Sequence, residues 1–230
     1  MTIDPPPVRA ILLDFDGTML ETESASYGSW RELLDEHGYE LTPEAWSAAV
    51  GTIGGVDPLE LLEEHLGTDV DRDVLEDRAK RRHHQLLEQE RLRPGIEQLV
   101  DEARDRGLHV AVVTSASERW VRGHLARLGL YDDIEVVAAD GDADRAKPHP
   151  LLYREAAALL GVDAAAAVAV EDSPNGVKAA RAAGMQVIAF PNPITEAMDL
   201  GEADAIVADL DGLGLDGFLD VLGRRAEAAV

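Results

Sequence analysis

The chain has 230 residues, no cysteine and a formal net charge of -24 at pH 7. This length fits one sizeable domain, or one domain with a smaller insertion. The lack of cysteine excludes disulfides and cysteine-bound metals, and the strong acidity disfavours nucleic acid as a partner, because a nucleic-acid footprint is basic and clustered. Residues 1–7 lack the pattern of a secretion signal, and no segment is apolar over a membrane-spanning length. We therefore expect a cytoplasmic protein without membrane contact, as a monomer or small homo-oligomer.

A short apolar run at residues 8–13 predicts a buried strand that ends at Asp14 and Asp16. Two carboxylates so close in the chain cannot both stay ionised cheaply unless a cation lies between them. Carboxylate oxygens suit a hard divalent ion, so this spacing favours Mg²⁺. Gly17 allows a sharp turn directly afterwards. The alternative is an ordinary turn after a strand, because Asp and Gly are common turn residues.

Between residues 22 and 90 the sequence contains no convincing strand. Its apolar spacing and helix-start signals predict four helices, at residues 24–37, 43–50, 57–66 and 71–90, with a flexible glycine-rich loop at 51–55. Three tryptophans, Trp30, Trp46 and Trp120, lie at helical spacing with other apolar residues, so we expect them in the hydrophobic core. This part of the chain is predicted to be a small all-helical unit.

From residue 93 onward, helical and strand patterns alternate with short links. Helices are predicted at 96–106, 118–128, 150–160 and 174–183, and strands at 108–113, 134–138, 165–170 and 186–190, with a short edge strand at 205–207. Near-continuous apolar strands between helices indicate a parallel sheet covered on both faces. The fold class is therefore α/β, a Rossmann-like parallel sheet core made of residues 1–18 and 93–230, with the all-helical unit 19–92 inserted.

Polar residues follow the ends of several predicted strands, where open α/β sheets bind ligands. Ser115 and the backbone N–H of Ala116 precede a helix and can bind an anion, although a serine here can also simply cap that helix. Lys147 lies between the third strand and a proline-rich turn, and its ammonium suits phosphate. Glu171 and Asp172 end the fourth strand, where helix capping by Asp172 is the alternative.

Together these segments resemble the four motifs of the haloacid dehalogenase superfamily, in the family's order and spacing. The motifs are Asp-Phe-Asp-Gly-Thr at 14–18, the serine at 115, Lys-Pro-His-Pro at 147–150 and Glu-Asp-Ser-Pro-Asn-Gly at 171–176. The last motif is typical of the branch that contains β-phosphoglucomutase and sugar-phosphate phosphatases. In that branch the helical insertion is a cap domain. The resemblance thus implies a core of haloacid dehalogenase type at 1–18 and 93–230, with a helical cap at 19–92.

The resemblance also implies the chemistry. Asp14 would be the nucleophile that forms an aspartyl-phosphate, and Asp16 the general acid and then the general base. Mg²⁺ would be held by Asp14, the backbone carbonyl of Asp16 and Asp172, with Glu171 at the ion or close to it. Mg²⁺ and Lys147 can offset the repulsion between a carboxylate nucleophile and a phosphate.

The same resemblance implies that Ser115, Ala116 and Lys147 bind the phosphoryl group of a small phosphorylated substrate. Dehalogenating members lack the second aspartate, so Asp16 favours phosphoryl chemistry. We therefore predict a Mg²⁺-dependent phosphatase of a small phosphorylated metabolite, such as a sugar phosphate.

Two other functions stay open. A β-phosphoglucomutase-like phosphohexomutase is the first alternative, but such mutases carry a cap arginine and a histidine where this chain has Asp57 and, by count, Ser26. A mutase must hold a bisphosphate, which needs that extra positive charge. The second alternative is a non-enzymatic binding protein that keeps the fold as a scaffold, and the intact acidic and lysine positions argue against it.

Overall fold

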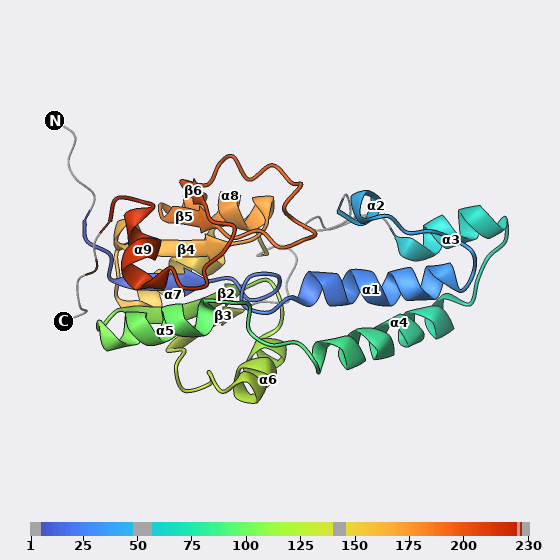
Figure 1. Cartoon of the computed structure of the whole chain (residues 1–230), viewed down its shortest axis with the longest axis horizontal. Helices are drawn as coiled ribbons and strands as arrows, with labels where there is room; N and C mark the ends of the chain where they lie inside the picture. The colour runs from blue at the N-terminus through green and yellow to red at the C-terminus, as the bar shows by residue number, and fades with distance from the viewer. Residues whose placement is uncertain (1–5, 48–56, 140–145, 225, 227–230) are drawn as a thin grey trace.

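The computed structural model describes residues 6–47, 57–139, 146–224 and 226. In Figure 1 a sheet with its flanking helices forms one lobe, and the first four helices project from it as a second lobe. In chain order the described elements are β1 (Ala10–Leu13), α1 (Thr22–Asp35), α2 (Pro43–Ser47), α3 (Pro58–Leu66), α4 (Arg72–Leu87), α5 (Ile96–Asp105), β2 (His109–Thr114), α6 (Glu118–Leu128), β3 (Val136–Ala139), α7 (Leu151–Leu160), a short 3-10 helix (Ala164–Ala166), β4 (Ala167–Glu171), α8 (Pro174–Ala183), β5 (Gln186–Ala189), β6 (Ala205–Ile206) and α9 (Gly214–Asp220).

The strands form a six-stranded sheet in the order β3-β2-β1-β4-β5-β6, and every pairing is parallel. The first strand is therefore central: Leu12 is in register with Ala111 of β2 on one side and with Ala169 of β4 on the other. The predicted parallel sheet of an α/β fold is confirmed. Since all strands run the same way, the residues that follow β1, β2 and β4 meet at one edge.

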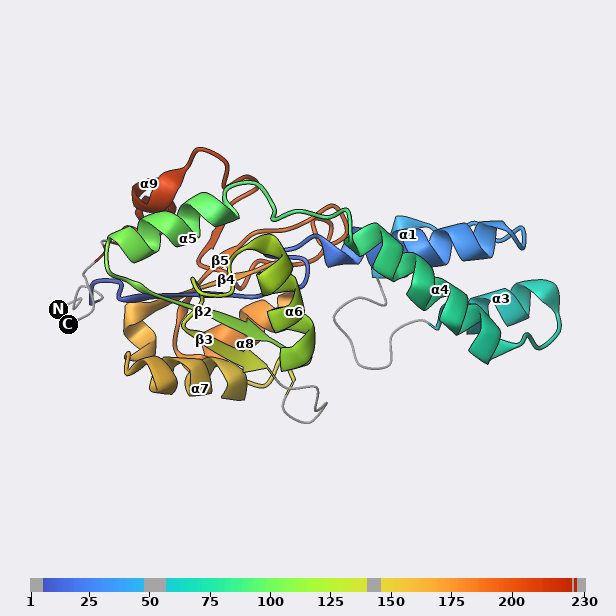
Figure 2. The same cartoon turned by 90° about the horizontal axis from the view of Figure 1, so that it is seen from below.

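Helices cover both faces of the sheet, and alternate residues of β1 face opposite ways. Ile11 and Leu13 belong to a buried cluster with side chains of α5, α6 and α9, whereas Ala10 and Leu12 belong to another with side chains of α7 and α8. Figure 2 shows α5 and α9 on one side of the strands and α7 on the other. Burial on both faces explains why the strands read as continuous apolar runs.

Helix α9 was not predicted, because glycines at 212, 214 and 217 make the segment after residue 207 read as a loop. Tertiary packing overrides this weak local tendency. Phe218 and Leu219 are fully buried in the cluster that α5 shares, and the backbone N–H of Leu215 donates to Glu102 Oε2 at 2.6 Å. That bond satisfies one of the free donors in the first turn of α9.

Helices α1–α4 share a further buried cluster, which includes Leu33, Leu34, Leu62 and Leu75 and is joined by Ile194 from the segment after β5. Ion pairs such as Arg82–Glu32 at 2.6 Å join α4 to α1, but they are solvent-exposed and therefore add little to the stability of the fold. The apolar cluster is thus the main source of cohesion. The predicted loop at 51–55 and the end of the second helix lie outside the described residues, and the domain boundaries at residues 18 and 92 stay a prediction.

The chain enters and leaves this helical unit side by side. Leu20 and Leu92 form an antiparallel bridge, and the backbone N–H of Arg93 donates to Met19 O at 2.9 Å. The guanidinium of Arg93 then donates to three carbonyl oxygens, those of Gly17 (2.7 Å), Phe190 (2.9 Å) and Pro191 (2.6 Å). This one side chain ties the turn after β1, the end of the helical unit and the segment after β5 together. Among the described helices, none has the length and apolar character needed to cross a lipid bilayer.

We expect Arg93→Lys to lower the free energy of unfolding by about 2–4 kcal/mol, because an ammonium cannot replace a guanidinium that serves three carbonyl groups. Urea unfolding followed by tryptophan fluorescence measures this loss. The matched control is Arg91→Lys. Arg91 lies two residues earlier and its side chain is exposed, so we expect this substitution to change the free energy of unfolding by less than about 0.5 kcal/mol. Equal effects at the two positions would contradict the anchoring role of Arg93.

Candidate active site

Three buried carboxylates gather at the edge of the sheet where β1 and β4 end. Asp14, Glu171 and Asp172 each place one carboxylate oxygen within 4.8 Å of the others. The backbone N–H of Asp14 donates to Val170 O at 3.0 Å, which continues the pairing of β1 with β4 beyond Leu13. The register of two neighbouring strands therefore brings together residues that are more than 150 positions apart in the sequence.

Lys147 provides the cation at this cluster. Its Nζ contacts Asp14 Oδ1, pairs with Glu171 Oε1 at 2.6 Å and donates to Val113 O at 2.8 Å. Burial alone lowers the pKa of a lysine, but Asp14 and Glu171 outweigh it and raise the pKa of Lys147. The side chain thus stays protonated at neutral pH and crosslinks the ends of β1, β2 and β4.

Glu171 has one satisfied and one unsatisfied carboxylate oxygen. Tyr153 Oη and Lys147 Nζ both contact Oε1, whereas Oε2 is buried without a hydrogen-bond partner. Burial raises the pKa of Glu171 to about 7; Lys147 opposes this shift and Asp14 adds to it. The backbone of Gly176 packs so closely that an added Cβ would lie 1.8 Å from Oε2. The glycine of the fourth motif therefore makes room for this carboxylate.

Asp172 is held by two polar side chains from other segments. Asn192 Nδ2 donates to its Oδ2 at 2.6 Å, and Thr18 Oγ1 donates to its Oδ1 at 3.4 Å. Burial, followed by the nearby charges of Asp14 and Glu171, raises the pKa of Asp172 well above its ordinary value. Asp172 is not the helix cap that its position allows: the side chain of Ser173 accepts from Gly176 N at 3.2 Å and caps α8.

These residues fit a divalent cation. Three carboxylates face one lysine, one buried carboxylate oxygen has no partner, and the oxygen donors are those that Mg²⁺ takes. A cation among Asp14, Glu171 and Asp172 would relieve the repulsion that raises the pKa values of Glu171 and Asp172.

Asp16 lies in a different environment from Asp14, although only Phe15 separates them. Its Oδ1 accepts a hydrogen bond from Trp120 Nε1 at 3.1 Å, and it is not part of the buried carboxylate group. Burial and then the charge of Asp14 raise the pKa of Asp16 to about 6, against the hydrogen bond from Trp120. A carboxyl group with this pKa can both give and take a proton near neutral pH.

The predicted anion site at the start of α6 is only partly available. Ser117 caps the helix by accepting from Trp120 N at 3.4 Å, so Ser115 is not the cap; the Ser115 hydroxyl accepts from Lys147 N at 3.1 Å instead. The backbone N–H of Ala116 already donates to Thr114 Oγ1 at 3.1 Å. Ser115 and Lys147 therefore lie together, whereas an anion at Ala116 would have to compete with the hydroxyl of Thr114.

The model of the haloacid dehalogenase-like hydrolases matches residues 8–184, which include every site residue described above except Asn192. The chain belongs to the haloacid dehalogenase-like hydrolases.

Individual relatives agree with this family. YhcW of Bacillus subtilis (strain 168), described as a candidate phosphatase, is 37% identical over 95% of this chain and 99% of its own length. CbbY of Cereibacter sphaeroides is 34% identical over 91% of this chain and 97% of its own. A crystal structure of a CbbY variant from Rhodobacter sphaeroides, in complex with xylulose-(1,5)bisphosphate, superposes with a TM-score of 0.72 at 31% identity, over 91% of this chain and 98% of that one. This haloacid dehalogenase-like hydrolase is a phosphatase, a phosphoric monoester hydrolase that acts on phosphorylated metabolites.

Sequence reasoning missed four residues of this haloacid dehalogenase-like site. Tyr153 and Asn192 hold the carboxylates of Glu171 and Asp172, and Trp120, expected only in the core, also donates to Asp16. Glu23 of α1 is the fourth: burial, then the charge of Asp16, raises its pKa to about 7. No local pattern distinguishes these residues, because each acts on a partner in a different segment or in the turn after β1.

Gly17 offers a direct test of how tightly this site is packed. It has φ +80°, and an added Cβ would lie 2.3 Å from Asp172 Oδ2. We expect Gly17→Ala to displace Asp172 and to lower phosphatase activity at least about 10-fold, because small misplacements of reacting groups slow catalysis strongly.

The matched control is Gly67→Ala, which has a similar φ of +68° but no atom within 4 Å of an added Cβ. Backbone strain alone costs about 1–2 kcal/mol, and activity should be retained. Urea unfolding and phosphate release measure both variants. If Gly17→Ala kept full activity, close packing of the turn against Asp172 would not matter for function.

Proposed function

We propose that this chain is a Mg²⁺-dependent phosphatase that hydrolyses a small sugar phosphate through an aspartyl-phosphate on Asp14. The observation that carries the proposal is the placement of Asp14 in contact with Lys147 and next to the carboxylates of Glu171 and Asp172, at the carboxyl ends of the central strands. A carboxylate held there faces the cleft where α/β sheets bind their ligands.

Asp14, Asp172 and the backbone carbonyl of Asp16 would hold Mg²⁺, with Glu171 at the ion or close to it. When bound, this ion neutralises charge on the phosphoryl oxygens and so lets an anionic nucleophile approach. Lys147 supplies the other positive charge, and Ser115, whose hydroxyl lies 3.1 Å from the backbone N of Lys147, would bind a second phosphoryl oxygen. This local charge matters because the chain as a whole repels anions.

The reaction would take two steps on two aspartates. One carboxylate oxygen of Asp14 attacks phosphorus, the bond from phosphorus to the ester oxygen breaks, and the leaving oxygen takes its proton from Asp16. A water molecule then attacks the phosphorus of the aspartyl-phosphate, gives its proton to Asp16 and releases inorganic phosphate from Asp14. A covalent intermediate of this kind divides one difficult displacement into two easier ones.

The helices α1–α4, within the proposed cap at residues 19–92, would cover the cleft and exclude water during the first step. The paired connections at Leu20 and Leu92 would form its hinge. The glycine-rich loop at 51–55 lies outside the described residues. Closure of such an element over a reaction site is a common way to exclude water.

A phosphatase fits better than a phosphohexomutase. The carboxylate of Asp57, where such mutases carry an arginine, accepts from Leu59 N at 2.9 Å and contacts Arg72, so it serves as the helix cap of α3. Ser26 takes the place of the mutase histidine. Neither residue supplies the positive charge that holding a bisphosphate requires.

We expect Mg²⁺-dependent phosphate release from one or two members of a broad panel of phosphorylated metabolites, and loss of this release in EDTA. Colorimetric phosphate detection measures it. Release that is indifferent to EDTA would contradict the metal site. If phosphate were released from no member, while a sugar monophosphate isomerised only after addition of a sugar bisphosphate, the enzyme would be a mutase.

We expect Asp14→Asn to reduce kcat by about 10⁴-fold or more, because the variant lacks the nucleophile. The matched control is Asp105→Asn at an exposed position at the end of α5, which should keep full activity. Full metal-dependent hydrolysis by Asp14→Asn would refute the aspartyl-phosphate. Equally low hydrolysis by the wild type and an Asp14/Asp16 double variant would point to a non-enzymatic binding protein.

A further inference from the structure

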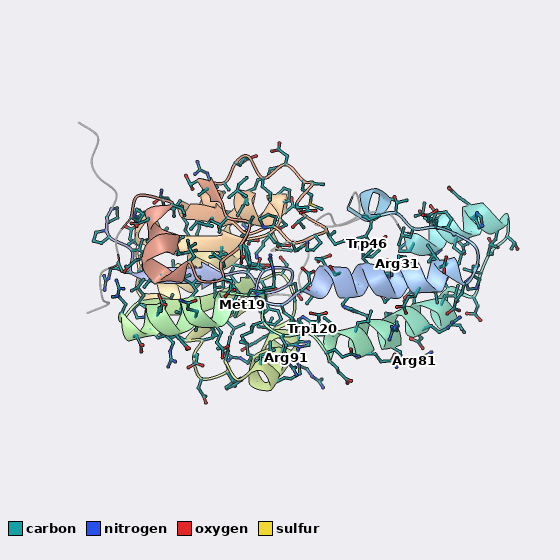
Figure 3. All side chains as sticks on the ribbon, viewed as in Figure 1. Met19, Arg31, Trp46, Arg81, Arg91 and Trp120 are labelled. Atoms are coloured by element: carbon teal, nitrogen blue, oxygen red, sulfur yellow. The ribbon has the colours of Figure 1, made fainter. Side chains whose placement is uncertain are left out.

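Trp120 joins the proposed acid of the reaction to the helical unit. Its indole Nε1 donates to Asp16 Oδ1 at 3.1 Å, a contact between residues 104 positions apart. Figure 3 shows Trp120 between α6 and the end of α4 nearest the sheet, whereas Trp46 lies near α2 in the other lobe. The side chain of Thr22 also lowers the pKa of Asp16, but by less than Trp120 does.

Histidines hold the Trp120 ring in place. His124, one turn later on α6, packs edge-on with a distance of 4.4 Å between ring centroids, and it also lies 6.0 Å from the ring of Phe15. His83 and His84 of α4 approach the indole from the helical unit, each at 6.2 Å. The orientation of the Trp120 ring is therefore determined by contacts with side chains of both α4 and α6.

The packing around this ring is incomplete. A cavity of about 580 Å³ lies between α4 and α6 and is lined by Trp120 together with His84, His124 and Arg127, among others. Because this side of the indole borders open space, its orientation depends on few contacts. Removal of one of them should let the ring move and should loosen the hydrogen bond to Asp16.

The chemistry of indole gives this bond a direction. Indole N–H can donate but cannot accept. When Asp16 carries its proton, Oδ1 must therefore remain the acceptor from Trp120, and the proton is placed on Oδ2. A carboxyl group fixed in this way presents its acidic proton on one known side.

We propose that Trp120 is a positioning residue, which aims the Oδ2 proton of Asp16 at the leaving oxygen and is itself held by His84 and His124. The proposal rests on the proposed function, in which Asp16 protonates the leaving oxygen as the bond from that oxygen to phosphorus breaks. It predicts that loss of the indole N–H matters only when the leaving oxygen needs a proton. An alkoxide needs one to leave, whereas p-nitrophenolate is stable without it.

The test compares kcat/KM of Trp120→Phe for two probes, p-nitrophenyl phosphate and glycerol phosphate. kcat/KM reports the first step, phosphorylation of Asp14, so the later action of Asp16 as a base does not affect it. We expect a loss of about 10- to 100-fold with the alkyl ester, and of less than about 3-fold with the aryl ester. Equal losses with both esters would reduce Trp120 to a structural role, and no loss with either would overturn the proposal.

Two further variants sharpen this comparison. His84→Ala removes a support of the indole without changing the donor, and should show the same preference for the aryl ester at a smaller magnitude; an unchanged ratio would show that His84 does not hold the ring. Trp46→Phe is the matched control, because the indole nitrogen of Trp46 is buried without a hydrogen-bond partner. It should leave the ratio of the two esters unchanged, and circular dichroism verifies that each variant is folded.

Asp16→Asn separates this proposal from the function on which it rests. If that variant loses the alkyl ester selectively and Trp120→Phe does not, Asp16 is the acid and Trp120 does not position it. If Asp16→Asn lowers kcat/KM equally for both esters, Asp16 is not the acid in the first step, and the role of Asp16 in the proposed function is wrong.

Discussion

The arrangement of this molecule depends on a cluster of buried negative charges that nearby positive charge balances only in part. Three buried carboxylates, from Asp14, Glu171 and Asp172, each place one oxygen within 4.8 Å of the others, and the ammonium of Lys147 pairs with two of them, Asp14 and Glu171. Such a group is costly to bury unless its members are paired and hydrogen-bonded. The surrounding donors reduce this cost only in part, because Glu171 Oε2 stays without a partner. The folded protein thus forms a site that could hold a further cation, and under the proposed function this cation would allow a phosphate to bind next to a carboxylate.

The sheet makes this concentration of charge achievable. Because β1 lies between β2 and β4, its carboxyl end adjoins theirs. The strands are buried on both faces of the sheet, and this burial keeps their register fixed. The turn that follows must be compact, which explains why Gly17 contacts Asp172 directly and why Arg93 binds the Gly17 carbonyl at 2.7 Å. Stability of the core and placement of the reactive groups therefore rest on the same strands and turns.

Much of this arrangement could be predicted from the sequence because its causes are local or repetitive. Apolar runs alternating with amphipathic helices indicated the parallel sheet, and polar motifs at strand ends indicated where the site residues meet. The rest depends on contacts that leave no local pattern. Asn192 reaches Asp172 from beyond β5, and the packing of Phe218 on the core creates α9 in a segment rich in glycine. The resemblance supplied the roles of Asp14 and Asp16, but not the partner of Asp16, because the position of Trp120 is that of an ordinary core residue on α6.

Asp14 and Asp16 have identical side chains but lie in different environments, as the two roles proposed for them require. Asp14, the proposed nucleophile, pairs with Lys147, a lysine whose pKa is raised. Asp16 points away from that cluster to a neutral donor, and burial raises its pKa to about 6. The strand ends at Leu13 and the chain turns at Gly17, so the side chain of Asp16 need not point in the same direction as that of Asp14. The proposed division of roles between nucleophile and acid would therefore follow from where the strand stops, which is a property of the backbone as much as of the two carboxylates.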